Sequence, residues 1–81
     1  METIEYTLGS YIERKFGLEN NPDNYSTDLF ATDIIDSLGA AEFFDYIETN
    51  WHFTITPDEA VETPLETINE ITDFIKAKTR A

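Results

Sequence analysis

The residues best placed to do chemistry form the tripeptide Asp36-Ser37-Leu38, which follows a polar loop and opens a predicted helix. A serine at a helix start points its hydroxyl to solvent beside unpaired backbone N–H groups. A phosphodiester formed there would be stabilised by the positive end of the helix dipole. Asp and Ser are also the usual residues of a plain helix cap. On its own, the tripeptide therefore indicates either an attachment site on Ser37 or a structural cap.

Few other residues of the chain are suited to catalysis. The sequence has no cysteine, which excludes a disulfide framework, a thiolate metal site and a cysteine nucleophile. The single histidine, His52, has no serine, cysteine or metal-ligand set near it in sequence, so we expect a surface or boundary residue. The Asp and Asn residues of positions 19–32 lack the spacing of a calcium-binding loop. We expect no catalytic residues, no metal site and therefore no enzyme.

The charge of the chain is strongly negative. Its 17 Asp+Glu residues and 5 Lys+Arg residues give a net charge of −12. The basic residues lie only near the two ends: Arg14, Lys15, Lys76, Lys78 and Arg80. Such a charge repels nucleic acids and anionic lipids and favours basic protein partners. Because no apolar run is long enough to span a bilayer and the first residues do not resemble a signal peptide, we expect a cytoplasmic protein without membrane insertion.

The first half of the chain predicts one helix and one long loop. A length of 81 residues allows a single domain, residues 1–81, with a modest core. Apolar residues recur every three or four positions from Ile4 to Phe16, which predicts an amphipathic helix that ends at Gly17. Residues 19–32 are rich in turn formers, and we expect three apolar side chains to pin this loop to the core: Tyr25, Leu29 and Phe30.

A second helix is predicted from Ser37 to Asn50, with Asp36 or Ser37 as its cap. The residues expected to face inward are Leu38, Ala41, Phe44 (or Phe43) and Ile47. Three acids repeat every third residue and predict an acidic stripe on the solvent side: Glu42, Asp45 and Glu48. Trp51 and Phe53, just beyond this helix, are expected to join the core.

The last third of the chain contains the same helix-start signal twice, in Thr56-Pro57-Asp58-Glu59 and in Thr63-Pro64-Leu65-Glu66. Each has Thr as cap, Pro in the first helical position and Glu three residues after the cap. Two starts seven residues apart predict one short helix, followed by a long one from Pro64 to about Lys78. No segment alternates like a convincing strand, so the fold class is all-α, with four helices.

The run from Leu29 to Phe44 resembles the phosphopantetheine attachment region of acyl carrier proteins. The core of that region is Asp-Ser-Leu, followed at a fixed distance by Glu and an apolar pair. The segments 55–60 and 67–75 also resemble the short third helix and the last helix of this family. The resemblance implies an acyl-carrier-type four-helix bundle, with three long helices, a short third helix and a long first loop, present as a monomer.

The same resemblance implies a function and its residues. Ser37 would carry 4'-phosphopantetheine, transferred from coenzyme A by a phosphopantetheinyl transferase, and cargo would ride on this arm as a thioester. Asp36 and Leu38 would form the recognition surface around the serine. The acids of the second helix, Glu42, Asp45 and Glu48, would meet basic docking surfaces. Further partners would be an acyl or aminoacyl ligase and the downstream acyl-transfer or synthase enzymes.

Details around the serine are more similar to stand-alone D-alanyl or aminoacyl carriers than to fatty-acid carriers. Ile34 takes the place of a glycine common in fatty-acid carriers, and Gly39 directly follows Leu38. Asp33 stands where aminoacyl carriers often have glycine, and Asp tolerates the left-handed conformation. The cargo stays open between fatty acyl, aminoacyl and polyketide groups. The alternative function is an acidic helical protein-binding module or inhibitor without a prosthetic group.

Overall fold

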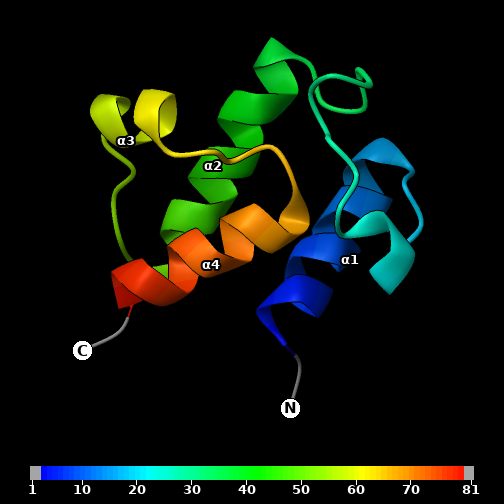
Figure 1. Ribbon diagram of the computed structural model, residues 1–81, viewed down its shortest axis with the longest axis horizontal. Helices are drawn as coiled ribbons and strands as arrows, with labels where there is room; N and C mark the ends of the chain where they lie inside the picture. The colour runs from blue at the N-terminus through cyan, green and yellow to red at the C-terminus, as the bar shows by residue number, and fades with distance from the viewer. Residues whose placement is uncertain (1–2, 80–81) are drawn as a thin grey trace.

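The computed structural model describes residues 3–79, and within this range the chain is all-helical (Figure 1). Its elements are α1 (Ile4–Phe16), a short 3-10 helix η1 (Pro22–Asn24), α2 (Ser37–Trp51), α3 (Pro57–Glu62) and α4 (Ile68–Thr79). The described residues contain no strand. The expected all-α class is confirmed. None of the helices in this part of the chain has the length and apolar character needed to cross a membrane.

The core lies between α1, α2 and α4, whereas α3 contributes no buried residue and lies at the periphery (Figure 1). The apolar side chains that form the core are Leu8, Tyr11, Ile12, Leu29, Ile35, Phe43, Ile47, Leu65, Ile68, Ile71, Phe74 and Ile75.

The bounds of α1 agree with the prediction. Thr3 caps its start by accepting a hydrogen bond from Tyr6 N, and Gly17 ends it with a φ of 82°.

The long loop between α1 and α2 is pinned to the core as predicted. Leu29 is fully buried, and Tyr25 and Phe30 are half-buried against the core cluster. Two backbone hydrogen bonds tie the same loop to the chain around the start of α4. Leu29 N donates to Glu66 O at 2.8 Å, and Asn69 N donates to Tyr25 O at 3.0 Å. The loop is therefore a fixed part of the fold and not a loose connection.

The inward face of α2 differs in part from the prediction. Gly39, Phe43 and Ile47 are its buried residues, spaced by four, so Phe43 takes the central core position. Leu38, at 71% exposure, and the exposed Ala41 were expected to face inward, and that expectation is wrong. Once Phe43 and Ile47 define the buried stripe, the helical period turns positions 38 and 41 toward solvent.

The C-terminal end of α2 lies at the edge of the core. The helix continues one residue past the predicted end, to Trp51, and stops where His52 adopts the left-handed conformation, with φ 60° and ψ 50°. His52 is exposed, as expected for a surface residue. Trp51 and Phe53 on either side of it are half-buried and pack against the core cluster. They therefore contribute to the core from its edge.

The last helix starts later than predicted. Thr63 is extended, with a ψ of 130°, and α4 begins at Ile68 instead of Pro64. Thr67 and Glu70 form the cap: Glu70 N donates to Thr67 Oγ1 at 3.1 Å, and Thr67 N donates to Glu70 Oε1 at 3.2 Å. The bond from Leu29 N to Glu66 O ties the segment before α4 to the first loop, which is compatible with the later start.

Candidate functional site

The start of α2 separates the capping role from the candidate attachment residue. Asp36 is the cap, and its Oδ1 accepts a hydrogen bond from Gly39 N at 2.7 Å. Ser37 is the first residue of the helix and is exposed. Among residues 3–79, no hydrogen bond involves the Ser37 hydroxyl. The cap interpretation of the tripeptide therefore applies to Asp36, and the serine oxygen is left accessible at the positive end of a 15-residue helix.

Two neighbouring contacts hold Ser37 in place. Ile35 is only 2% exposed, and its N–H donates to Leu29 O at 2.9 Å, which fixes the chain just before the serine. On the other side, a Cβ added to Gly39 would lie 2.8 Å from Cε1 of Phe16, so the first turn of α2 packs closely on the end of α1. The accessible hydroxyl thus stands on a rigid support.

The turn that leads into the site has an unusual backbone. Asp33 has a φ of 59°, in the left-handed region that non-glycine residues seldom occupy. The expectation that Asp33 tolerates the left-handed conformation is confirmed. Its short polar side chain makes Asp one of the residues that adopt this conformation most readily.

The three acidic residues of α2 differ in how exposed their side chains are. Glu42 and Asp45 are exposed, and Glu42 Oε2 lies 3.5 Å from Nζ of Lys15. Glu48 is half-buried, and its Oε2 accepts a hydrogen bond from Ile55 N at 2.6 Å. That bond fastens the connection between α2 and α3 to the end of α2. The fully exposed part of the predicted stripe therefore consists of Glu42 and Asp45.

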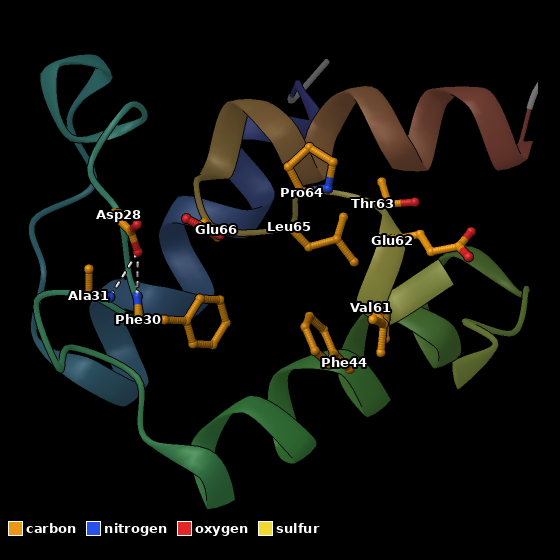
Figure 2. Close-up of a pocket in the computed structure, with 11 residues that line it drawn as sticks. Asp28, Phe30, Ala31, Phe44, Val61, Glu62, Thr63, Pro64, Leu65 and Glu66 are labelled. Carbon is orange, nitrogen blue, oxygen red and sulfur yellow. Dashed lines mark hydrogen bonds between the residues drawn. The ribbon is translucent and has the colours of Figure 1, made fainter. Parts of the chain in front are cut away.

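A pocket of about 740 Å³ lies beside α2, between the first loop and the segment around α3 (Figure 2). Its lining residues are Asp28, Phe30, Ala31, Phe44, Ala60, Val61, Glu62, Thr63, Pro64, Leu65 and Glu66. In Figure 2 the rings of Phe30 and Phe44 and the side chain of Leu65 project into the space, while the carboxylate of Glu62 points away from it. The pocket has an apolar body with polar groups at its edge.

One end of the pocket carries a pair of interacting carboxyl groups. The pKa of Asp28 is lowered, first by the hydrogen bond from Ala31 N at 2.8 Å and then by the neighbouring carboxyl group of Glu66. The pKa of Glu66 is raised, because the neighbouring carboxylate of Asp28 favours its protonated form. Asp28 thus ionises first, and Glu66 retains a proton to higher pH.

No sequence pattern predicted this pocket. Phe30 and Phe44 were expected as a loop anchor and a core residue, and both have partly buried side chains that also line the cavity. Residues 64–67 were expected in a helix, whereas they precede α4, and Pro64, Leu65 and Glu66 form part of the wall. The cavity depends on where α4 begins, and the capping signal at Thr63 predicted that start at Pro64 instead of Ile68.

Within residues 3–79, no group of three or more His, Cys, Asp or Glu side chains is placed to hold a metal ion. Comparison with known proteins identifies no relative: no family model, curated protein or solved structure matches this chain. The start of α2 and the neighbouring pocket are therefore the features on which a functional proposal rests.

Proposed function

We propose that this protein is a carrier protein of the acyl carrier type that bears 4'-phosphopantetheine on Ser37. The observation that supports the proposal is the division of roles at the start of α2. Asp36 satisfies the cap, so the Ser37 hydroxyl is exposed and unbonded among the described residues, beside the positive end of the helix. The four helices, with a short third one and a long first loop, agree with the architecture proposed from the resemblance.

The residues present suit this group. Ser37 Oγ would attack the phosphorus that bears pantetheine in coenzyme A, the pyrophosphate bond would break with adenosine 3',5'-bisphosphate as the leaving group, and the hydroxyl proton would pass to a base of the transferase. The first N–H groups of α2 would then lie beside the new phosphodiester. The arm would supply a thiol, which the chain itself lacks, as the point of attachment for a thioester cargo.

The surroundings of Ser37 offer a surface for partner enzymes. Leu38 is 71% exposed directly after the serine, and Glu42 and Asp45 lie further along the same helix. A transferase, a ligase or a synthase with an apolar contact and basic side chains would match this surface. Charge pairs of this kind mainly raise the encounter rate and set orientation, which suits a carrier that visits several enzymes in turn.

The proposal is tested by intact mass spectrometry after incubation of the purified protein with coenzyme A and a broad-specificity phosphopantetheinyl transferase. We expect a gain of one phosphopantetheine in the natural protein and none in Ser37→Ala. Ser26→Ala is the matched control, since Ser26 is also exposed but lies in the first loop, and it should gain the group.

The absence of a mass gain would favour the alternative function, an acidic helical module that binds a protein partner. If folded protein gains no mass with two different transferases, Ser37 is not an attachment site. The exposed acids of α2 would then be those of a helical module that binds a basic partner, and such a module would keep its function in Ser37→Ala.

A further inference from the structure

A lysine from α1 lies on the surface around Ser37. Among residues 3–79, the ion pair that involves α2 joins Nζ of Lys15 to Oε2 of Glu42 at 3.5 Å. The two side chains are 48% and 51% exposed, so the pair is open to solvent. Lys15 comes from the last turn of α1, and Glu42 from the second turn of α2. The first acid after Ser37 along α2 is thus engaged by a cation of the same chain.

The packing of α1 on α2 places Lys15 at this point. Phe16, the next residue, lies so close to the first turn of α2 that a Cβ added to Gly39 would be 2.8 Å from its Cε1. Gly17 then ends α1 with a φ of 82°, so the helix stops at this contact. The contact that supports Ser37 therefore also holds Lys15 within reach of α2.

An enzyme that modifies Ser37 is expected to cover this ion pair. Glu42 lies five residues after Ser37, roughly 8 Å along the helix axis. A protein interface of standard size buries roughly 800 Å² on each partner, which corresponds to a disc with a radius of about 16 Å. When Ser37 lies near the centre of such a disc, Glu42 and Lys15 fall inside it. The pair would therefore meet the partner directly.

Lys15 opposes the charge of the surface on which it lies. Asp36, Glu42 and Asp45 are exposed acids at the start of α2 and along it, and they attract a partner with Arg or Lys around its active site. Lys15 repels the same partner, and a partner cation can pair with Glu42 only by replacing it. Because exposed ion pairs contribute little to stability, this exchange would slow docking without preventing it.

We propose that Lys15 is an autoinhibitory residue of the docking surface, which occupies Glu42 until a basic partner enzyme displaces it. The inference rests on the proposed function, because it concerns the enzymes that act on Ser37 and on its arm. Removal of the lysine charge would leave Glu42 available and would speed the reaction with such enzymes. The residue thus sets the rate of docking, whereas Ser37 provides the site of attachment.

The proposal is tested by the kcat/KM of phosphopantetheine transfer from coenzyme A, with a transferase whose active site is surrounded by Arg and Lys. At low salt we expect Lys15→Gln to raise kcat/KM by about two- to threefold. Lys76→Gln is the matched control, since it makes the same change of charge in the last turn of α4, far from the start of α2 (Figure 1). Its effect should be clearly smaller. Equal gains in the two variants, or no gain in Lys15→Gln, would overturn the proposal.

A double-mutant cycle tests whether Lys15 acts through Glu42. In the Glu42→Gln background no ion pair remains to be displaced, so Lys15→Gln should raise kcat/KM by much less than it does in the natural protein. High salt, about 0.5 M, should also abolish the gain, because it screens exposed charges. An undiminished gain in either case would overturn the proposal.

The same assay separates this inference from the proposed function. If the natural protein is modified on Ser37 and the Lys15→Gln variant reacts at the same rate, only the role of Lys15 is wrong. If the natural protein gains no phosphopantetheine, the proposed function fails, and the role of Lys15 fails with it.

Discussion

The side chain of Asn20 lies directly against Cα of Gly9, in the space that the Cβ of any larger residue would fill. Three hydrogen bonds hold this side chain there: Asn20 Nδ2 to Tyr6 O and to Ser10 Oγ, and Tyr25 OH to Asn20 Oδ1. The backbone N–H of Asn20 donates a fourth to Glu13 Oε1. The first loop is thus fastened to the middle of α1 before it crosses to α2 and Ser37.

Replacement of Gly9 by alanine should therefore lower the free energy of unfolding. A methyl group at this position would displace the bonded amide of Asn20, and such overpacking costs about 1–3 kcal/mol. The change is measured by urea denaturation. In an exposed helix position the same replacement normally stabilises by about 1 kcal/mol, and the reverse substitution Ala41→Gly on the exposed face of α2 measures that contribution here. A stabilised Gly9→Ala variant would contradict the packing of Asn20 on α1.

Threonine substitutions should distinguish the two candidate starts of α4. Thr67→Ala removes the cap that bonds Glu70 N and should cost about 0.5–2 kcal/mol of unfolding free energy. Thr63→Ala should change it by less than about 0.5 kcal/mol, because Thr63 makes no such bond among the described residues. Equal effects in thermal or urea unfolding would mean that the helix starts at both positions in different molecules.

The parts of the fold that the sequence predicted well are those with a single local signal. The helix from Ile4 to Phe16 has one apolar stripe, one cap and one glycine stop, and its observed bounds agree with the prediction. The loop anchors Tyr25, Leu29 and Phe30 were predicted because a long loop in a small domain must bury something. That Asp33 can adopt the left-handed conformation was expected from the resemblance to carrier proteins together with the properties of Asp.

The parts that were not predicted depend on contacts between distant segments. The start of α4 was predicted at Pro64 from the Thr63-x-x-Glu66 signal, which is wrong: Thr67 and Glu70 form the cap, and Glu66 O instead accepts a hydrogen bond from Leu29 N. The pocket forms between the segment before α4 and the first loop, so neither its volume nor the pair of carboxyl groups had a local signal. The accessible serine was predicted, whereas its separation from the cap required the geometry of Asp36.

The two adjacent phenylalanines of α2 should have very different effects on stability. Phe43 is fully buried and stacks on Tyr11, with ring centroids 5.4 Å apart, so Phe43→Ala should cost about 3–5 kcal/mol. Phe44 is half-buried at the pocket, and Phe44→Ala should cost about 1–2 kcal/mol. Urea denaturation measures both. A larger cost at Phe44 would show that α2 is rotated about its axis relative to the structure described.

The contact between Asp28 and Glu66 should make stability depend on pH. Asp28, whose pKa is lowered from 3.8, stabilises the fold above that pH, and its contribution is lost as the pH falls through the lowered pKa. Glu66, whose pKa is raised from 4.5, stabilises the fold below that pH, and its contribution is lost as the pH rises through the raised pKa. The pair is therefore most favourable near pH 4 and less favourable at pH 7.

Substitution of Glu66 by glutamine should remove the part of this dependence that develops above pH 4.5, because glutamine stays neutral and can still donate a hydrogen bond to Asp28. We expect the variant and the natural protein to unfold at similar temperatures near pH 4, and the variant to unfold at a higher temperature at pH 7. Glu62→Gln is the control, since it removes one negative charge from the net charge of −12, as Glu66→Gln does, without touching the pair. An equal gain at pH 7 in both variants would assign the effect to general charge repulsion, and the absence of any gain in Glu66→Gln would show that the two carboxyl groups do not interact in solution.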